Sequence, residues 1–562
     1  MAEYSTGKIS FSYGAAPRSA EADRAQLQRI RQLAQAGDVA EAGRLAEAAL
    51  AEGLQHPMLF NLAAGRLEQE ARYEDALARL QEGHALAPAD PGLNHAMGLV
   101  LHRLERFVQA VGCFDAVIAA QPGFAAAHAA RGAALEALGD IQGAEAAYRR
   151  AVELQPGHLV AISGLASLAG RRGRSTEARE LAGQVLAAQP NYPDAVMVLA
   201  QADLADGRPD VGEARLYDLL ADPRPTVEQR ALAQGLLGDL LDAQDRIAEA
   251  FTAYDTCNRA LLAAYKRRFG SGVSALDYAR EVLALVDRLP SDAWAQGARA
   301  PVSLPGGGQA AGHVFLVGFP RSGTTLLEQV LASHPDVEAL EERDTLADAM
   351  AAYARTPAQL VGLADAPASE IARLREAYWA RVAREGAGPA GKLFVDKHPL
   401  HTFRLPVIAK LFPEAKVLFA RRDPRDVVLS CFRRRFAMSA PMYQLLTMEG
   451  AARFYDVAMQ LGERLGGRIP LPHRVVRHES LVEDFDATAR ELCDFLGLAW
   501  TDALRGFAER IQDRGVATPS GAQLARGLSA EGMGAWRRYA PQLAPAEPIL
   551  APWVARFGYA VA

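Results

Sequence analysis

A loop bounded by two glycines stands in the second half of the chain. Gly318 and Gly323 have the G-x-x-x-x-G spacing of a phosphate-binding P-loop, within VFLVGFPRSGTTLLEQ. A nucleoside triphosphatase would carry lysine after the second glycine, but this chain carries Thr324 and then Thr325. Arg321 inside the loop supplies positive charge instead. Backbone N–H groups, a helix N-terminus and an arginine together suit one compact anion.

A second candidate anion site follows further along the chain, in KVLFARRDPRDVVLSCF. Arg422 ends a predicted strand there, and Ser430 lies on the next predicted helix. Six arginines fall between positions 421 and 435, although the net charge of the chain is −6. Arg421 is left unassigned. The last arginines of the run are expected to be solvated or paired with acids: Arg433, Arg434 and Arg435.

These two segments resemble those of one family. PRSGTTLLEQ closely resembles the 5′-phosphosulfate loop of sulfotransferases that use 3′-phosphoadenosine 5′-phosphosulfate (PAPS). In that family a strand-end arginine and a serine eight residues later bind the 3′-phosphate, and Arg422 and Ser430 have this spacing. VATPSGAQL resembles a further cofactor-contacting loop, with Ser520 and Gln523 at the matching positions. The resemblance implies a PAPS site formed by Arg321, Ser322, Gly323, Thr324, Thr325, Arg422, Ser430 and Ser520.

The resemblance also implies a general base and a cation for the leaving group. In tyrosylprotein sulfotransferases and bacterial sulfotransferases linked to tetratricopeptide repeats (TPRs), a glutamate follows a His-Pro pair. The match in HPDVEALEERDTL falls on Glu342, with Glu341 as the one-residue alternative. The alternative interpretation makes both glutamates acids at a helix N-terminus, but catalysis is favoured for Glu342 because it is close in sequence to the helix of the phosphate loop. Lys397 matches a lysine that stabilises the leaving phosphate, a task that Arg321 shares. His398 is expected to make local hydrogen bonds.

Two more segments match the family, one of them with a difference. VVRHESLV corresponds to an Arg-Tyr-Glu stretch, but His478 stands in place of the tyrosine. AWRRY corresponds to a C-terminal W-R-x-Y stretch of the TPR-linked enzymes. No metal is implied, because PAPS chemistry in this family needs none.

The first half of the chain repeats with a period of 34 residues. The prolines in register are Pro88, Pro122, Pro156 and Pro190. The alanines in register are Ala42, Ala76, Ala110, Ala144 and Ala178. A turn is predicted five residues before each of these alanines, and the series continues to Gly207. The predicted turn positions are Gly37, Ala71, Glu105, Gly139, Gly173 and Gly207. Each unit has a small residue that permits close helix packing, a turn, and a proline that breaks the chain before the next unit. This pattern resembles the TPR over residues 21–266. After Gly207 the phase slips, and Ala250 with Tyr254 marks one further unit.

The second half alternates apolar strand candidates with helical patterns, which predicts a parallel sheet. The strand candidates are residues 313–317, 392–395, 416–420 and 473–479. The predicted fold is therefore an N-terminal TPR superhelix followed by a P-loop-like α/β sulfotransferase domain with a parallel sheet. The predicted divisions are a repeat array at 21–266, a helical extension and linker at 267–312, and a sulfotransferase domain at 313–562.

Composition narrows the function classes. The chain has 562 residues and a pI of about 6.1, which argues against a non-specific nucleic-acid binder. Its four cysteines are far apart, which favours buried thiols in a reducing cytoplasm. The N-terminal sequence lacks the apolar core of a signal peptide, and no uncharged apolar run reaches the ~18 residues of a membrane span.

The sequence thus predicts an enzyme that transfers a sulfuryl group from PAPS to an acceptor hydroxyl and releases adenosine 3′,5′-bisphosphate. The acceptor is left open between a protein tyrosine, a sugar hydroxyl and a small metabolite, and an oligomer is compatible with the sequence. Capture of the acceptor in the TPR groove and a scaffolding role for the array are equally favoured. The alternatives are a P-loop kinase and a TPR adaptor with a degenerate nucleotide-binding domain.

Overall fold

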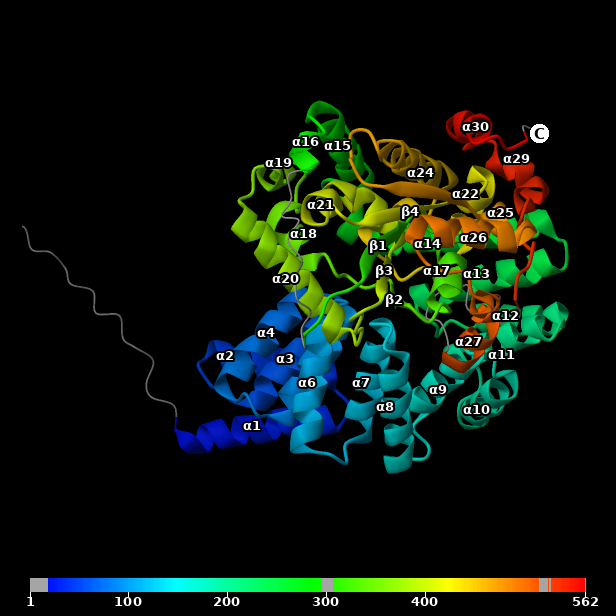
Figure 1. The fold of residues 1–562 in the computed structure, drawn as a ribbon. Coiled ribbons are helices and arrows are strands. Elements are labelled where there is room, and N and C mark those ends of the chain that lie inside the picture. The colour runs from blue at the N-terminus through cyan, green and yellow to red at the C-terminus, as the bar shows by residue number, and fades with distance from the viewer. Residues whose placement is uncertain (1–18, 296–306, 515–523, 525–526, 561–562) are drawn as a thin grey trace, which may run out of the picture. The chain divides into compact units, whose positions relative to one another are not determined.

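The computed structural model describes residues 19–295, 307–514, 524 and 527–560. The chain divides into two compact units, Met1–Leu165 and Ala166–Ala562. The first unit is helical throughout its described part (Figure 1). Its helices are α1 (Ala20–Gln35), α2 (Val39–Ala51), α3 (Pro57–Gln69), α4 (Tyr73–Leu86), α5 (Pro91–Arg103), α6 (Phe107–Ala120), α7 (Ala125–Ala137), α8 (Ile141–Leu154) and the start of α9 (Leu159–Arg171).

The predicted repeat positions have the backbone and burial that the pattern requires. Every predicted turn position has a positive φ, from 55° at Ala71 to 85° at Gly37. Each alanine in register is fully buried. In the shifted unit Asp245 takes the turn position with φ 60°, and Ala250 is buried. The turn geometry therefore persists even where the residue is not glycine, because tertiary packing of the helix pair sets it.

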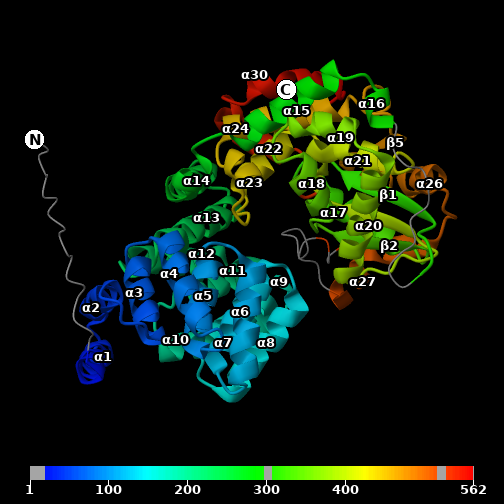
Figure 2. The same ribbon diagram turned by 90° about the vertical axis from the view of Figure 1, so that its left-hand side faces the viewer.

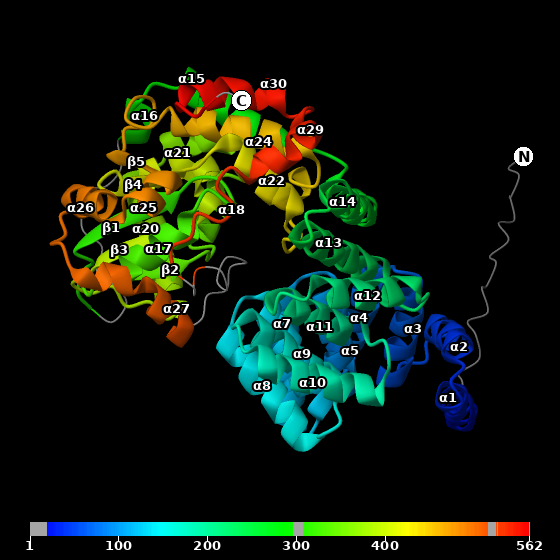
Figure 3. The same cartoon turned by 90° about the vertical axis from the view of Figure 1, so that its right-hand side faces the viewer.

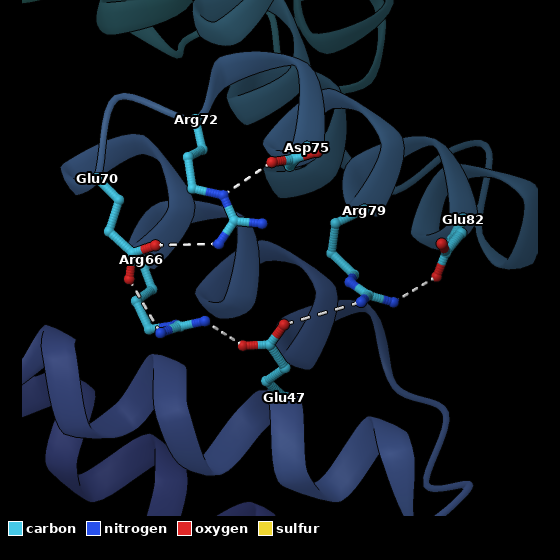
Figure 4. Close-up of polar contacts among 7 residues, drawn as sticks. All are labelled: Glu47, Arg66, Glu70, Arg72, Asp75, Arg79 and Glu82. Atoms are coloured by element: carbon cyan, nitrogen blue, oxygen red, sulfur yellow. Dashed lines mark hydrogen bonds and ion pairs between the residues drawn. The ribbon is translucent and has the colours of Figure 1, made fainter.

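Ion pairs connect neighbouring helices on the surface of the first unit (Figure 4). Arg66 of α3 pairs with Glu47 of α2, and also with Glu70 at 3.0 Å. Arg79 of α4 lies 3.9 Å from the Glu47 carboxylate. The network is completed by Arg72, Asp75 and Glu82. Exposed pairs of this kind contribute little individually, but here one carboxylate is shared by arginines of two successive helices.

The second unit begins with the rest of the helical array. The helices after α9 are α10 (Ser175–Ala188), α11 (Pro193–Ala205), α12 (Pro209–Ala221), α13 (Val227–Ala243), α14 (Ile247–Phe269), α15 (Ala275–Arg288) and α16 (Asp292–Ala295). Trp294 of α16 is fully buried, although it lies in the range predicted as a linker. None of the described helices combines the length and apolar character needed to cross a membrane.

A five-stranded, entirely parallel sheet follows, with the strand order β2-β3-β1-β4-β5. The strands are β1 (Gly312–Val317), β2 (Val337–Glu341), β3 (Leu393–Lys397), β4 (Lys416–Arg421) and β5 (His473–Arg477). Four match the predicted strands. β2 was not predicted from the sequence, because Glu, Ala and Leu are strong helix formers and pairing with β3 overrides their preference.

Alternate residues of the strands pack on opposite faces of the sheet. Val314 and Leu316 join one core with α17 (Thr324–Ala332), α26 (Phe485–Leu496) and α27 (Phe507–Arg514). Phe315 and Val317 join the other core, with α20 (Ala368–Arg384), α21 (Leu405–Leu411) and α24 (Met448–Gly462) (Figure 3). Burial on both faces explains why these strands are continuous apolar runs.

The remaining elements of the second unit are short. They are α18 (Ala347–Tyr353), α19 (Gln359–Ala364), η1 (Pro399–Arg404), α22 (Pro424–Arg433), α23 (Ala440–Gln444), α25 (His478–Glu483), η2 (Asp502–Gly506), η3 (Ala535–Tyr539), α29 (Ala540–Leu543) and α30 (Glu547–Arg556), where η marks a 3₁₀ helix.

The array and the sheet of the second unit share one hydrophobic core. Buried side chains of α12 to α15 belong to the same cluster as Phe315 and Phe419 of the strands. Helix α15 packs on α24 (Figure 2). Phe251 of α14 stacks on Phe432 of α22 with ring centroids 5.3 Å apart. The last helices of the array are therefore part of the fold that supports the sheet.

Candidate active site

An open pocket of about 990 Å³ lies at the carboxyl ends of the strands. Segments that follow β1, β2, β3, β4 and β5 all contribute to it, as expected for a parallel α/β sheet. Its lining includes Pro320, Arg321, Gly323, Thr324, Thr325, Glu342, His398, Pro399, Leu400, Arg422, Phe436, Met442, His478, Leu528 and Glu531.

Neighbouring atoms leave no room for a side chain at either glycine of the β1–α17 loop. A Cβ atom on Gly318 would lie 2.7 Å from the carbonyl oxygen of Ala420, and one on Gly323 would lie 2.6 Å from Nδ1 of His478. Gly323 also has φ 94°, in the left-handed region that favours glycine. Arg321 has φ 71° without being a glycine, a conformation that costs about 1–3 kcal/mol and is typical of functional loops.

The loop arginine meets the predicted 3′-phosphate residues directly. Nε of Arg321 donates a hydrogen bond to Oγ of Ser430 at 3.0 Å. The guanidinium of Arg422 donates to the carbonyl oxygens of Arg321, at 3.5 Å, and of Gly532. Burial, together with the nearby charges of Arg434 and Arg422, lowers the pKa of Arg321. Cations crowded in this way are stabilised by an anion.

Three arginines stand at the C-terminal end of α22. Arg433 pairs with Asp242 of α13 at 2.5 Å, and Arg435 pairs with Asp239 at 2.6 Å, which confirms the expected pairing with acids for these two. Arg434 and Arg433 both line a second open pocket, of about 780 Å³, that also contains Arg422 and Ser430. Arg421 lies outside both pockets, with its guanidinium 3.8 Å from the ring centroid of Phe557.

Lys397 is fully buried and surrounded by carboxylates. Its Nζ lies 2.8 Å from Glu342, 3.3 Å from Glu328 and 3.5 Å from Glu341. These acids raise the pKa of Lys397 against the opposing effect of burial, so the side chain is an ammonium at neutral pH. Burial raises the pKa of Glu328 to about 8, although the charge of Lys397 acts in the opposite direction.

The two candidate bases differ in position. Glu341 is the last residue of β2 and Glu342 follows it, so the interpretation of both as helix N-terminal acids is wrong. The side chain of Glu342 is 40% exposed and lines the pocket, whereas that of Glu341 is 20% exposed and is not among the lining residues. Glu342 also has φ 44°, and its N–H donates to the carbonyl oxygen of Lys397 at 2.8 Å.

A buried hydrogen bond fixes the segment after β2. Oγ1 of Thr345 donates to Oδ2 of Asp396 at 2.7 Å, and the hydroxyl of Tyr378 donates to the same oxygen at 2.8 Å. Asp396 precedes Lys397 on β3 and points to the other face of the sheet. The chain around Glu342 is thus held to β3 from two sides.

Two histidines border the pocket. Nδ1 of His398 accepts a hydrogen bond from the N–H of Leu400 at 3.2 Å, as expected for a local role. Burial lowers the pKa of His398 well below the ordinary value, so its ring is neutral. Burial, with the charges of Arg422 and Arg321, lowers the pKa of His478 to about 3. Nδ1 of His478 is buried and has no hydrogen-bond partner in the described part of the chain.

The structure thus brings most of the predicted site residues to one pocket, and it adds others. Ser520 and Gln523 lie outside the described residues. Glu328 was missed because it stands in the regular helical pattern after the loop, where only its contact with Lys397 distinguishes it. Arg434 and the acids of α13 were missed because their roles depend on packing between distant segments. The described residues include no group of three or more His, Cys, Asp or Glu side chains placed to hold a metal ion.

Parts of the chain are similar to known proteins. A sulfotransferase family model matches residues 313–502, and a tetratricopeptide repeat model matches residues 95–158 and 164–228. An uncharacterized protein of Aquifex aeolicus is 25% identical over 424 residues, which cover 73% of this chain and 53% of that protein. Protein-tyrosine sulfotransferase 1 of Danio rerio is 27% identical over 263 residues, which cover 44% of this chain and 72% of that protein. A solved tetratricopeptide repeat protein of Parabacteroides merdae is 16% identical, with a TM-score of 0.35, and the alignment covers 43% of this chain and 94% of that one.

Proposed function

Since the chain carries a sulfotransferase-family domain together with tetratricopeptide repeats, we propose that it transfers a sulfuryl group from PAPS to an acceptor hydroxyl. The observation that carries this proposal is two pockets that share Arg321 and Arg422, one of them lined by Glu342, whose carboxylate pairs with the buried Lys397. Arg321 belongs to the first cationic site and Arg422 to the second.

The residues present suit the two phosphate groups of PAPS. The loop from Ser322 to Thr325, with Arg321, would hold the 5′-phosphosulfate at the N-terminus of α17. Arg422 and Ser430 would hold the 3′-phosphate, with Arg434 on the wall of the same cavity. Nε of Arg422 is a buried donor without a partner among the described residues, which favours an anionic ligand here.

The chemistry follows from the residues that border the reacting groups. PAPS, when bound, supplies a sulfuryl group whose bond to the bridging phosphate oxygen breaks as a bond to the acceptor oxygen forms. The carboxylate of Glu342 takes the proton of the acceptor hydroxyl. Lys397 and Arg321 place positive charge where the leaving phosphate becomes more negative. His398 and Leu400 form the wall beside Glu342.

The acceptor and its capture are further parts of the proposal. A protein tyrosine or a glycan would present its hydroxyl to Glu342, and the TPR array would bind the macromolecule that carries it. All four cysteines are buried and free, which supports the cytoplasmic location that we propose.

Calorimetry with adenosine 3′,5′-bisphosphate and with ATP–Mg²⁺ tests the proposed function. We expect the bisphosphate to bind at least about tenfold more tightly, because only this nucleotide occupies both cationic sites. Equal or tighter binding of ATP would reject the sulfotransferase and favour the kinase. Absence of binding to either nucleotide would favour the adaptor.

A further inference from the structure

Helix α13 of the array presents a row of acids to the sulfotransferase domain. Asp239, Asp242 and Asp245 follow one another at intervals of three along α13 and the turn after it, so they lie near one face. Asp239 and Asp242 line the cavity that contains Arg422, Arg434 and Ser430.

These acids hydrogen-bond to the neighbours of Arg434, and the charge of Asp239 also acts on Arg434 itself. Asp242 accepts a hydrogen bond from Arg433, and Asp239 accepts one from Arg435. The arginines on either side of Arg434 are therefore fixed, and their charges are balanced by carboxylates. Arg434 lines the same cavity as Arg433.

The same acids anchor the segment that supports Arg422. The hydroxyl of Tyr539 in η3 donates to Asp242 at 2.6 Å, and Arg538 pairs with Asp242 at 3.1 Å and with Asp245 at 2.7 Å. The carbonyl oxygen of Gly532, just before η3, accepts a hydrogen bond from Arg422.

The other end of this segment is anchored to α22. Asp426 accepts hydrogen bonds from the N–H groups of Gly534, at 2.6 Å, and Trp536, at 2.9 Å. The chain from Gly532 to Tyr539 therefore spans from the helix of Ser430 to the helix of Asp242.

We propose that α13 is a structural part of the cofactor site, with Asp242 and Asp239 as positioning residues that orient Arg434 and Arg422 toward the 3′-phosphate. This inference rests on the proposed function and assigns a role to the array that does not depend on acceptor binding. A carboxylate that is fixed between two cationic groups restricts their rotamers, and this preorganisation lowers the entropy lost when a phosphate binds.

Nucleotide selectivity in the full-length chain tests this role. The dissociation constants of adenosine 3′,5′-bisphosphate and AMP are measured for the wild type, Asp242→Asn and the matched control Asp218→Asn, an exposed aspartate of α12. We expect Asp242→Asn to weaken bisphosphate binding by about tenfold and AMP binding by less than about twofold, because AMP has no 3′-phosphate. The control should leave both constants unchanged.

A gentler variant keeps the test decisive if Asp242→Asn fails to fold. Tyr539→Phe removes only the hydroxyl that donates to Asp242 and keeps the buried ring. It should weaken bisphosphate binding by roughly two- to fivefold, with AMP binding again unchanged. Unchanged selectivity in a folded Asp242→Asn variant, or in Tyr539→Phe where the first does not fold, would overturn the role of α13. A wild type that does not discriminate between the two nucleotides would instead refute the proposed function.

Discussion

Lys397 has no exposed surface, so its charge is balanced by side chains and not by water. Three carboxyl groups lie within 3.5 Å of its ammonium, and they come from α17, the end of β2 and the residue after β2. The most exposed of them, Glu342, lines the pocket, while the most buried, Glu328, has a raised pKa. The ammonium of Lys397 thus links Glu342, the proposed base, to α17, the helix that follows the phosphate loop.

Replacement of the proposed base separates chemistry from binding. Glu342→Gln should reduce the rate of sulfuryl transfer by roughly 10²–10⁴, the range for a general base, while the affinity for adenosine 3′,5′-bisphosphate changes little. Steady-state kinetics and calorimetry measure the two effects. Glu341→Gln is the neighbouring control and should keep near wild-type turnover. The opposite result would assign the base to Glu341.

Replacement of Glu328 should appear in the pH dependence of stability. Its pKa is raised from 4.5 to about 8, so the folded state retains a proton that the unfolded chain releases. This contribution to stability is full below about pH 4.5 and is lost as the pH rises toward about 8. Glu328→Gln cannot ionise and should gain stability relative to wild type across that window, by up to about 1.4 kcal/mol per pH unit.

Thermal unfolding midpoints of wild type and Glu328→Gln, compared from about pH 5 to about pH 8, measure this difference. Glu376→Gln on α20 is the exposed control, and its difference from wild type should stay constant. A constant difference for Glu328→Gln as well would show that Glu328 is ionised in the folded protein.

Among the elements, four of the five strands were predictable and β2 was not. β1, β3 and β4 are buried on both faces, and each contains a run of three or more consecutive apolar residues. β2 is an edge strand with glutamates at two positions, and only its pairing with β3 distinguishes it from a helix. Pairs between distant segments, such as Asp242 with Arg433, could not be predicted, because no pattern in the nearby sequence marks either residue.

The β1–α17 loop gives a prediction at this scale. Gly323→Ala should destabilise the protein by about 1–3 kcal/mol, because a Cβ atom is strained at φ 94° and would lie 2.6 Å from His478. It should also weaken bisphosphate binding, since relief of this contact moves the loop. Gly183→Ala in α10 is the control: no atom lies within 4 Å of its added Cβ, and it should stabilise by about 0.5–1 kcal/mol. Equal shifts of the two unfolding midpoints would contradict the strained conformation of Gly323.

At the scale of the whole molecule, the hydrophobic core of the second unit continues through α12 to α15 and into the sheet. The division at 21–266, 267–312 and 313–562 describes segments of the sequence, and it remains a prediction. The repeat period and the alternation of strands and helices were sufficient to predict both halves of the fold. Neither pattern could indicate that array helices supply buried side chains to the sheet, because a repeat period describes only the contacts that one repeat makes with the next.

Fragments test this shared core. A fragment of residues 156–562 should fold and bind adenosine 3′,5′-bisphosphate with wild-type affinity, because it retains every helix of the shared core. A fragment of residues 313–562 should fail to fold, since it exposes the surface that α13, α14 and α15 cover. Circular dichroism and calorimetry check both. A folded, nucleotide-binding fragment of residues 313–562 would show that the array helices are dispensable.

The contacts of α13 also determine where such a chain can be recombined. Inner repeats can be duplicated, deleted or exchanged for foreign ones with little effect elsewhere, because each repeat packs on its neighbours. A foreign repeat in place of α13 and α14 would instead remove the acids that Arg433, Arg435 and Arg538 require. Substitutions at Asp239 and Asp242 must therefore be matched by substitutions in α22 and η3. Foreign repeats with a new binding specificity should therefore be joined within the array, before its last repeat.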